Sequence, residues 1–141
     1  MARTPPPVRS DYPWFCAMPT RWIDNDAYGH MNNVVHYSLF DTAISNWQLG
    51  RDFHENAAIR TLVVESGCIY HAEARYPDLI HGGVRLGHLG RTSWRYEIGL
   101  FRNDEDAAFA SGFFAQVAVD ADTGLPTPLS DAARRELEAL R

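Results

Sequence analysis

Residues 34–49 read VVHYSLFDTAISNWQL and form the clearest helical pattern in the chain. Apolar side chains recur there at the spacing that places them on one side of an α-helix, namely Val34, Tyr37, Phe40, Ile44 and Trp47. Asn32 or Asn33 stands where an N-cap is expected, because an asparagine oxygen can accept from the unpaired amides of a first turn. Gly50 stands where a C-terminal cap is expected. We therefore predict a helix over 34–49 with defined ends.

The rest of the chain is dominated by strand patterns. A short apolar run over 14–21 precedes the helix, and runs of alternating side chains follow it, over 62–72, 83–90, 94–100 and 107–119. After Ser130, a short amphipathic helix can pack back through Leu137 and Leu140. This order predicts an α+β domain in which a curved antiparallel β-sheet wraps around the long central helix. A single sheet leaves its other face in need of cover, so we expect a dimer or a higher oligomer.

Length and composition are those of an ordinary globular chain. With 141 residues, 45 % of them hydrophobic and 22 % charged, the chain fits one domain over 13–141 after a flexible, proline-rich segment over 1–12. The net charge of −5 offers no broad attraction to nucleic acid or anionic lipid. The sequence shows no secretory signal and no apolar segment long enough to span a bilayer. The two cysteines are far apart and suggest no disulfide framework, so we predict a cytoplasmic protein.

The polar stretch DNDAYGHMNN, residues 24–33, lies directly before the predicted helix. The first turn of a helix points free amide hydrogens outward and carries roughly half a positive charge, so it can polarise a carbonyl group. Asp26, one short loop away, could attack that carbonyl or activate a water. Asp26 and the amides near Asn33 would then meet the two needs of acyl transfer, a nucleophile or base and an electrostatic hole.

This stretch, continued by Tyr37, Phe40, Asp41 and Ala43, resembles the motif of hotdog thioesterases of the hydroxybenzoyl-CoA thioesterase type. The resemblance implies the hotdog fold, a homodimer that is often doubled to a tetramer, and hydrolysis of an acyl-CoA or acyl-carrier thioester without a metal or other cofactor. It also implies that Asp26 is the nucleophile or general base and that the amide of Asn33 polarises the carbonyl. The chain keeps the Gly-His-hydrophobe-Asn-Asn stretch that hydroxybenzoyl-specific members replace, so that substrate is not implied.

Substrate contacts are expected within the motif and at one distant turn. Within the motif we assign them to Tyr28, His30, Met31 and Asn32. Residues near the turn at 90–93 contact the phosphates of CoA in related thioesterases, which makes Arg91 and Ser93 candidates. Guanidinium groups suit phosphate geometry, although most such residues belong to a solvated face.

Three alternatives stay open at this point. Asp24, Asp26 and His30 could bind a metal, although no second cluster of ligands supports this. A hotdog dehydratase or hydratase would act on the same class of thioester but needs an acid–base pair whose usual motifs do not occur here. A non-catalytic acyl-CoA binder would bind such a ligand without turnover.

Overall fold

The computed structural model describes residues 3–53 and 56–141. It contains five strands, β1 Trp14–Pro19, β2 Ile59–Tyr70, β3 Leu79–Leu89, β4 Ser93–Arg102 and β5 Ala110–Asp120. The α-helices are α1 Val35–Gln48 and α2 Asp131–Glu138. Two single 3₁₀ turns, η1 Arg9–Asp11 and η2 Trp22–Asp24, lie in the first part of the chain.

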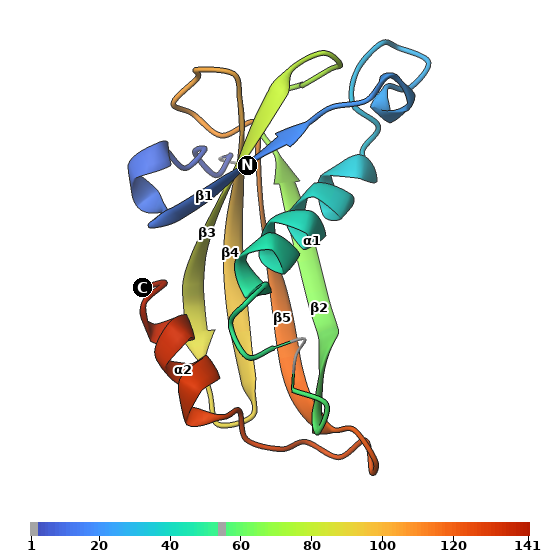
Figure 1. The fold of residues 1–141 in the computed structure, drawn as a ribbon. Coiled ribbons are helices and arrows are strands. Elements are labelled where there is room, and N and C mark those ends of the chain that lie inside the picture. The colour runs from blue at the N-terminus through green and yellow to red at the C-terminus, as the bar shows by residue number, and fades with distance from the viewer. Residues whose placement is uncertain (1–2, 54–55) are drawn as a thin grey trace.

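The strands form one antiparallel sheet in the order β1-β3-β4-β5-β2. The sheet is curved, and α1 lies across one of its faces while α2 packs beside the lower end of β3 (Figure 1). A long helix held by a curved antiparallel sheet, with a short C-terminal helix, is the predicted α+β hotdog architecture, which is confirmed.

The core lies between α1 and the sheet. From α1, Phe40, Ile44 and Trp47 are almost fully buried, as the helical spacing predicted. They pack with the inward side chains of β4, which are Trp94, Tyr96, Ile98 and Leu100. The helix begins one residue later than expected, and Val34 is 66 % exposed because it precedes the first turn. Gly50 follows the helix with a positive φ of 76°, which a glycine adopts without steric cost.

A β-bulge in β2 changes which of its side chains face α1. Leu62 pairs with Val117 on the outer face, the face of the sheet away from α1, whereas Ser66 pairs with Phe114 on the face toward α1. The register shifts between Val63 and Glu65, and one extra residue in a strand moves all later side chains to the opposite face. The sequence pattern predicted regular alternation over 62–72, with every second side chain on the same face. The bulge makes that prediction wrong.

One buried polar network lies among the apolar core residues. The Gln48 side-chain amide donates to the Tyr96 hydroxyl over 2.9 Å and to Oε1 of Gln116 over 3.1 Å. All three side chains are buried, so each needs the others to satisfy its hydrogen-bonding groups. The network ties the C-terminal end of α1 to β4 and β5.

The chain before β1 lies against the outer face of the sheet. Tyr12 is 6 % exposed and packs edge-to-face on Phe101, with ring centroids 5.9 Å apart. Pro7 accepts a hydrogen bond from the amide of Ala108 over 2.9 Å. The flexibility expected for residues 1–12 stays a prediction, but the structure places Pro7, Arg9 and Tyr12 in contact with β4 or the residues between β4 and β5.

Candidate active site

Asp26 lies in a tight loop between η2 and α1. Its amide donates to the carbonyl of His30 over 2.7 Å, and its Oδ1 accepts from the amides of Tyr28 and His30 over 2.9 and 3.3 Å. Gly29 makes the reversal possible with a φ of 77°. The second carboxylate oxygen, Oδ2, accepts no hydrogen bond from the described residues, so half of the carboxylate remains available to a ligand.

Asp24 is the more buried of the two motif aspartates, and both of its carboxylate oxygens accept hydrogen bonds from Arg21. It is 3 % exposed, accepts from the Arg21 amide over 2.8 Å and forms an ion pair of 3.0 Å with the Arg21 guanidinium. Its carbonyl accepts from the amide of Asn32 over 2.8 Å. Asp24 therefore fixes the loop on which Asp26 stands.

The segment that opens α1 presents one amide without an acceptor. Oδ1 of Asn32 accepts from the amide of Val34 over 3.1 Å, and the carbonyl of Asn32 accepts from Val35 over 2.9 Å. The amide of Asn33 makes no hydrogen bond within the described parts of the chain. The N-cap position of α1 is Val34, which makes no side-chain capping bond, so the prediction of an N-cap at Asn32 or Asn33 is wrong. Asn32 instead braces the turn before the helix through its bond to Val34, and the Asn33 amide is left free to donate.

Asp26 and Asn33 line the same cavity, which has a volume of about 490 Å³. Other predicted residues in its lining are Tyr28, His30 and Met31, whereas Asn32 does not line it. Its size falls within the range of small-molecule sites, about 300–1,000 Å³. The structure therefore brings together five residues that were selected from the motif.

The lining of the cavity also includes Tyr70 and His36, which sequence reasoning missed. Tyr70, at the end of β2, donates its hydroxyl to the carbonyl of Asn33 over 2.7 Å. Removal of this hydroxyl from water raises the pKa of Tyr70 to about 12, so it keeps its proton and acts as a donor. His36, in the first turn of α1, is 3 % exposed and packs edge-to-face on Tyr70 with ring centroids 4.7 Å apart.

The imidazole of His36 is neutral near pH 7. Burial lowers the pKa of His36, and the nearby backbone of Asn33 and Asn32 offsets that effect only in part. Its buried Nδ1 makes no hydrogen bond of acceptable geometry with the described residues. The helical spacing placed residue 36 near the helix start, but nothing in the sequence indicated that its ring would meet Tyr70.

The remaining wall is the connection from β2 to β3. Oε2 of Glu73 lies 3.0 Å from Nε2 of His30, a polar contact that is an ion pair only when the imidazole is protonated. The carbonyl of Ala74 accepts from the amide of Met31 over 2.7 Å. The amide of Tyr76 donates to Oδ1 of Asn25 over 3.0 Å. These contacts join the motif loop to a segment more than forty residues later in the chain.

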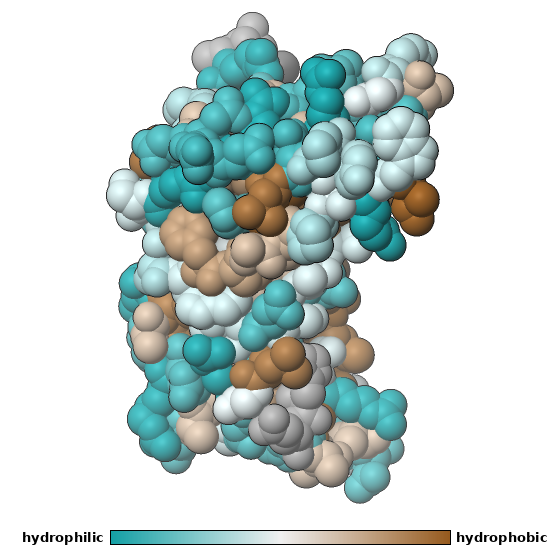
Figure 2. Space-filling view, turned by 45° about the horizontal axis from the view of Figure 1, so that its top comes forward, coloured by the Kyte–Doolittle hydropathy of each residue, from teal (hydrophilic) through white to brown (hydrophobic). Residues whose placement is uncertain are grey.

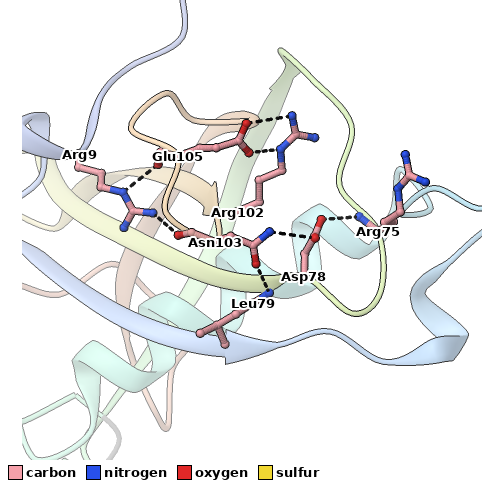
Figure 3. A network of polar contacts seen from close by, with 7 residues as sticks. All are labelled: Arg9, Arg75, Asp78, Leu79, Arg102, Asn103 and Glu105. Carbon is pink, nitrogen blue, oxygen red and sulfur yellow. Dashed lines mark hydrogen bonds and ion pairs between the residues drawn. The ribbon is translucent and has the colours of Figure 1, made fainter.

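A polar network supports the connection from β2 to β3 (Figure 3). Asp78 accepts from the Arg75 amide over 3.0 Å through Oδ2 and from the Asn103 side chain over 3.0 Å through Oδ1. Asn103 in turn accepts from the amide of Leu79 over 3.0 Å. The turn between β4 and β5 therefore holds the start of β3 and, through it, the wall of the cavity.

Arg91 and Ser93 lie far from this cavity within one chain. Ser93 pairs with Val117 near one end of the sheet, whereas Tyr70 pairs with Ala110 near the other end. The connection at 90–92 is held by Arg134, which donates to the carbonyls of Gly90 and Arg91 over 2.9 and 3.0 Å. The structure does not bring Arg91 or Ser93 to Asp26 in the same chain.

Other chemistries find little support in the described residues. Residues 3–53 and 56–141 contain no group of three or more His, Cys, Asp or Glu side chains arranged to hold a metal ion. Burial raises the pKa of the Cys68 thiol to about 11, so it is a poor nucleophile near pH 7. Within the same ranges, no helix is both long and apolar enough to cross a bilayer.

Comparison with known families agrees with the fold and the motif. The model of the thioesterase-like superfamily matches residues 19–137. That match covers most of the chain, including the Asp26 loop, α1 and all of β2 to β5. The chain belongs to the thioesterase-like superfamily.

Solved structures show the same architecture. The PA5185 protein from Pseudomonas aeruginosa strain PAO1 is 37 % identical, with a TM-score of 0.92 and 97 % of each chain covered. The PA2801 protein from Pseudomonas aeruginosa is 30 % identical, with a TM-score of 0.78 over 86 % of this chain and 95 % of that one. Slr0204, a 1,4-dihydroxy-2-naphthoyl-CoA thioesterase from Synechocystis, is 10 % identical, with a TM-score of 0.79 over 87 % of this chain and 93 % of that one, and shows the shared fold alone. No curated protein matches the chain significantly.

Proposed function

We propose that this chain hydrolyses acyl-CoA thioesters to a free acid and CoA. The observation that carries the proposal is the shared cavity of Asp26 and Asn33, in which a carboxylate oxygen and a backbone amide both lack partners among the described residues. Membership of the thioesterase-like superfamily supports thioester hydrolysis as the class of reaction. No cofactor or metal is needed for this chemistry.

In the proposed reaction, the Asn33 amide and the Asp26 carboxylate act on the same thioester carbonyl. The thioester carbonyl oxygen accepts from the Asn33 amide, which polarises the carbonyl and holds the negative charge that develops on its oxygen. The Asp26 carboxylate attacks the carbonyl carbon, or removes a proton from the water that does so. The carbon–sulfur bond breaks, the thiolate of CoA leaves and takes up a proton, and water supplies the oxygen of the acid product.

Residues around the cavity would position the acyl group. Tyr28, His30 and Met31 line the cavity, and so does Glu73, whose carboxylate contacts the His30 ring. Arg91 and Ser93 remain candidates for the CoA phosphates, and their distance from Asp26 within one chain means that they would have to serve the site of a second copy. An acyl-carrier protein as the alternative donor stays a prediction, as does a cytoplasmic location.

We also propose a homodimer formed through β2. Among the described residues β2 pairs only with β5, so its outer edge offers unpaired backbone groups to another strand. That strand exposes Leu62, Val63 and Val64, which are 46–63 % exposed. On the face that Figure 2 shows, apolar residues stand in separate patches among polar ones. Doubling of the dimer to a tetramer stays a prediction.

The function is tested by measuring the release of free thiol from a panel of acyl-CoAs. We expect Asp26→Asn to lower kcat by about a hundredfold or more, because an amide neither attacks the carbonyl nor accepts the proton of water. Asp104→Asn is the matched control, since Asp104 is exposed in the turn after β4. Equal rates for wild type and Asp26→Asn would refute the assignment. Loss of enoyl absorbance without thiol release would indicate a hydratase.

A further inference from the structure

A second cavity lies on the outer face of the sheet, away from α1 and Asp26. Its volume is about 550 Å³. The floor includes Phe113 of β5 and Ile69 of β2, and residues Pro5–Pro7 form one wall. Gly67 keeps the floor open beneath Phe113, because a Cβ at that position would lie 2.6 Å from the Phe113 ring. The cavity is therefore built largely from apolar groups.

Two arginines reach this cavity, and they differ in their partners. Arg85 donates to Oε2 of Glu97 over 2.8 Å and to the carbonyl of Asp11 over 3.2 Å, so its charge is balanced. Arg95 forms no ion pair and no hydrogen bond with the described residues. Its guanidinium lies over the Phe113 ring, 3.7 Å from the centroid. Stacking occupies the flat face of the guanidinium and leaves its N–H groups at the edge free.

The charges around the cavity favour a monoanion. Glu97 is neutralised by Arg85, and Arg95 contributes one positive charge without a bound acceptor. Asp11 adds a second carboxylate to the lining, so its two arginines and two carboxylates sum to no net charge, and a monoanion meets less repulsion there than a dianionic phosphate. A carboxylate matches a guanidinium edge with two parallel hydrogen bonds. An apolar body would lie along Phe113, Ile69 and the prolines.

The wall formed by Pro5–Pro7 is anchored through Arg9, two residues after Pro7. Arg9 donates to the carbonyls of Asn103 and Glu105 over 2.6 and 2.9 Å (Figure 3). The proline ring fixes φ near −65°, so the short segment between Arg9 and Thr4 has little freedom once its end is fixed. The turn that braces the Asp26 cavity thus also fixes a wall of the outer cavity.

We infer that this outer cavity binds an organic monocarboxylate with an apolar body, through the guanidinium edge of Arg95 and the ring of Phe113. The site is separate from the Asp26 cavity and does not depend on the function proposed above. The two cavities lie on opposite faces of the sheet, so a ligand in one does not occupy the other.

The test is calorimetric titration of the full chain with octanoate, with octanamide as the uncharged control. We expect saturable binding of octanoate and at least tenfold weaker binding of octanamide, because charge-assisted hydrogen bonds are lost. Arg95→Gln should weaken octanoate binding by at least tenfold, and Arg95→Lys by less. Arg135→Gln, an exposed arginine on α2, and Asp26→Asn should leave it unchanged.

Several outcomes would overturn this inference. Equal binding of octanoate and octanamide would show that the cavity recognises the apolar chain and not the carboxylate. Loss of binding in Asp26→Asn, with none in Arg95→Gln, would place the ligand in the other cavity. Absence of saturable binding up to the solubility of octanoate would exclude the site. If Arg95→Gln instead changes the oligomeric mass and octanoate does not bind, the outer face is an interface between copies. Circular dichroism confirms that each variant is folded.

Discussion

The hydroxyl of Tyr70 donates a hydrogen bond to the carbonyl oxygen of Asn33 over 2.7 Å. This contact joins the last residue of β2 to a residue that lines the Asp26 cavity and whose amide makes no hydrogen bond with the described residues. Rotation of the backbone at Asn33 would break the contact, so Tyr70 limits the orientations that this residue can adopt. An enzyme that stabilises a developing charge needs its donors fixed before the reaction begins.

Replacement of Tyr70 by phenylalanine should therefore affect turnover more than substrate binding. A net hydrogen bond contributes about 0.5–1.5 kcal/mol, which corresponds to a decrease of about two- to tenfold in kcat. KM should change less, and steady-state kinetics with the preferred acyl-CoA would measure both. Tyr76→Phe is the matched control, because Tyr76 is similarly exposed and its hydroxyl has no partner among the described residues. Identical kinetics in the two variants would remove Tyr70 from the site.

Substitution of Asp24 should mainly lower stability, whereas substitution of Asp26 should mainly lower activity. Asp24 uses one oxygen for the Arg21 guanidinium and the other for the Arg21 amide, and an asparagine could accept only one of these bonds. We expect Asp24→Asn to lower the free energy of unfolding by about 1–2 kcal/mol, a value reduced by the exposure of Arg21. Asp26→Asn keeps its loop hydrogen bonds through the amide oxygen and should change stability by less than about 0.5 kcal/mol. Urea unfolding of both variants would show the opposite order if Asp26 were the structural residue.

His36 should make part of the stability depend on pH. Burial lowers the pKa of His36 in the folded chain, whereas the unfolded chain binds the proton near the ordinary value. The unfolded state therefore binds more protons as the pH falls below about 6.5, and the folded state loses stability there. Between pH 7.5 and 5.5 the free energy of unfolding should therefore fall more for the wild type than for His36→Phe. Burial also lowers the pKa of His71, but that residue is present in both proteins and cancels in the difference. Parallel pH profiles of the unfolding free energy would contradict this prediction.

A charge in β2 should weaken the proposed dimer. Val64 is 63 % exposed in the edge strand, so Val64→Lys removes apolar surface and adds two like charges at an interface between copies. Sedimentation velocity should show dimers for the wild type and a shift to monomers for the variant. Leu125→Lys, with 65 % exposure in the turn after β5, should keep the wild-type mass. If both variants sediment alike, β2 is not the dimer contact.

Local patterns in the sequence were sufficient for α1 and for the Asp26 loop. The spacing of Phe40, Ile44 and Trp47 is set by the helix itself, and a turn with Gly29 needs no distant partner. The alternation over 94–100 likewise predicts that Trp94 and Tyr96 share one face, and the structure shows that this face is the buried one, with no bulge between β4 and β5 to interrupt the pattern.

The missed features all depend on distant pairing. Tyr70 reaches Asn33 across 37 positions, and the register that places it there is decided by the pairing of β2 with β5. The bulge near Val64 left no recognisable signal, since both faces of β2 carry apolar residues. The burial of Gln116 could not be predicted from its own strand, because the partner that satisfies its side chain is Gln48 of α1.

Tyr70 belongs at once to the rim of the sheet and to the wall around Asp26. A strand added alongside β2 would lie against the same residue that orients the Asn33 backbone. Self-association and turnover would then be thermodynamically linked, and specific activity would depend on how dilute the sample is. Rates measured at one protein concentration would combine both effects, whereas a dilution series would separate them.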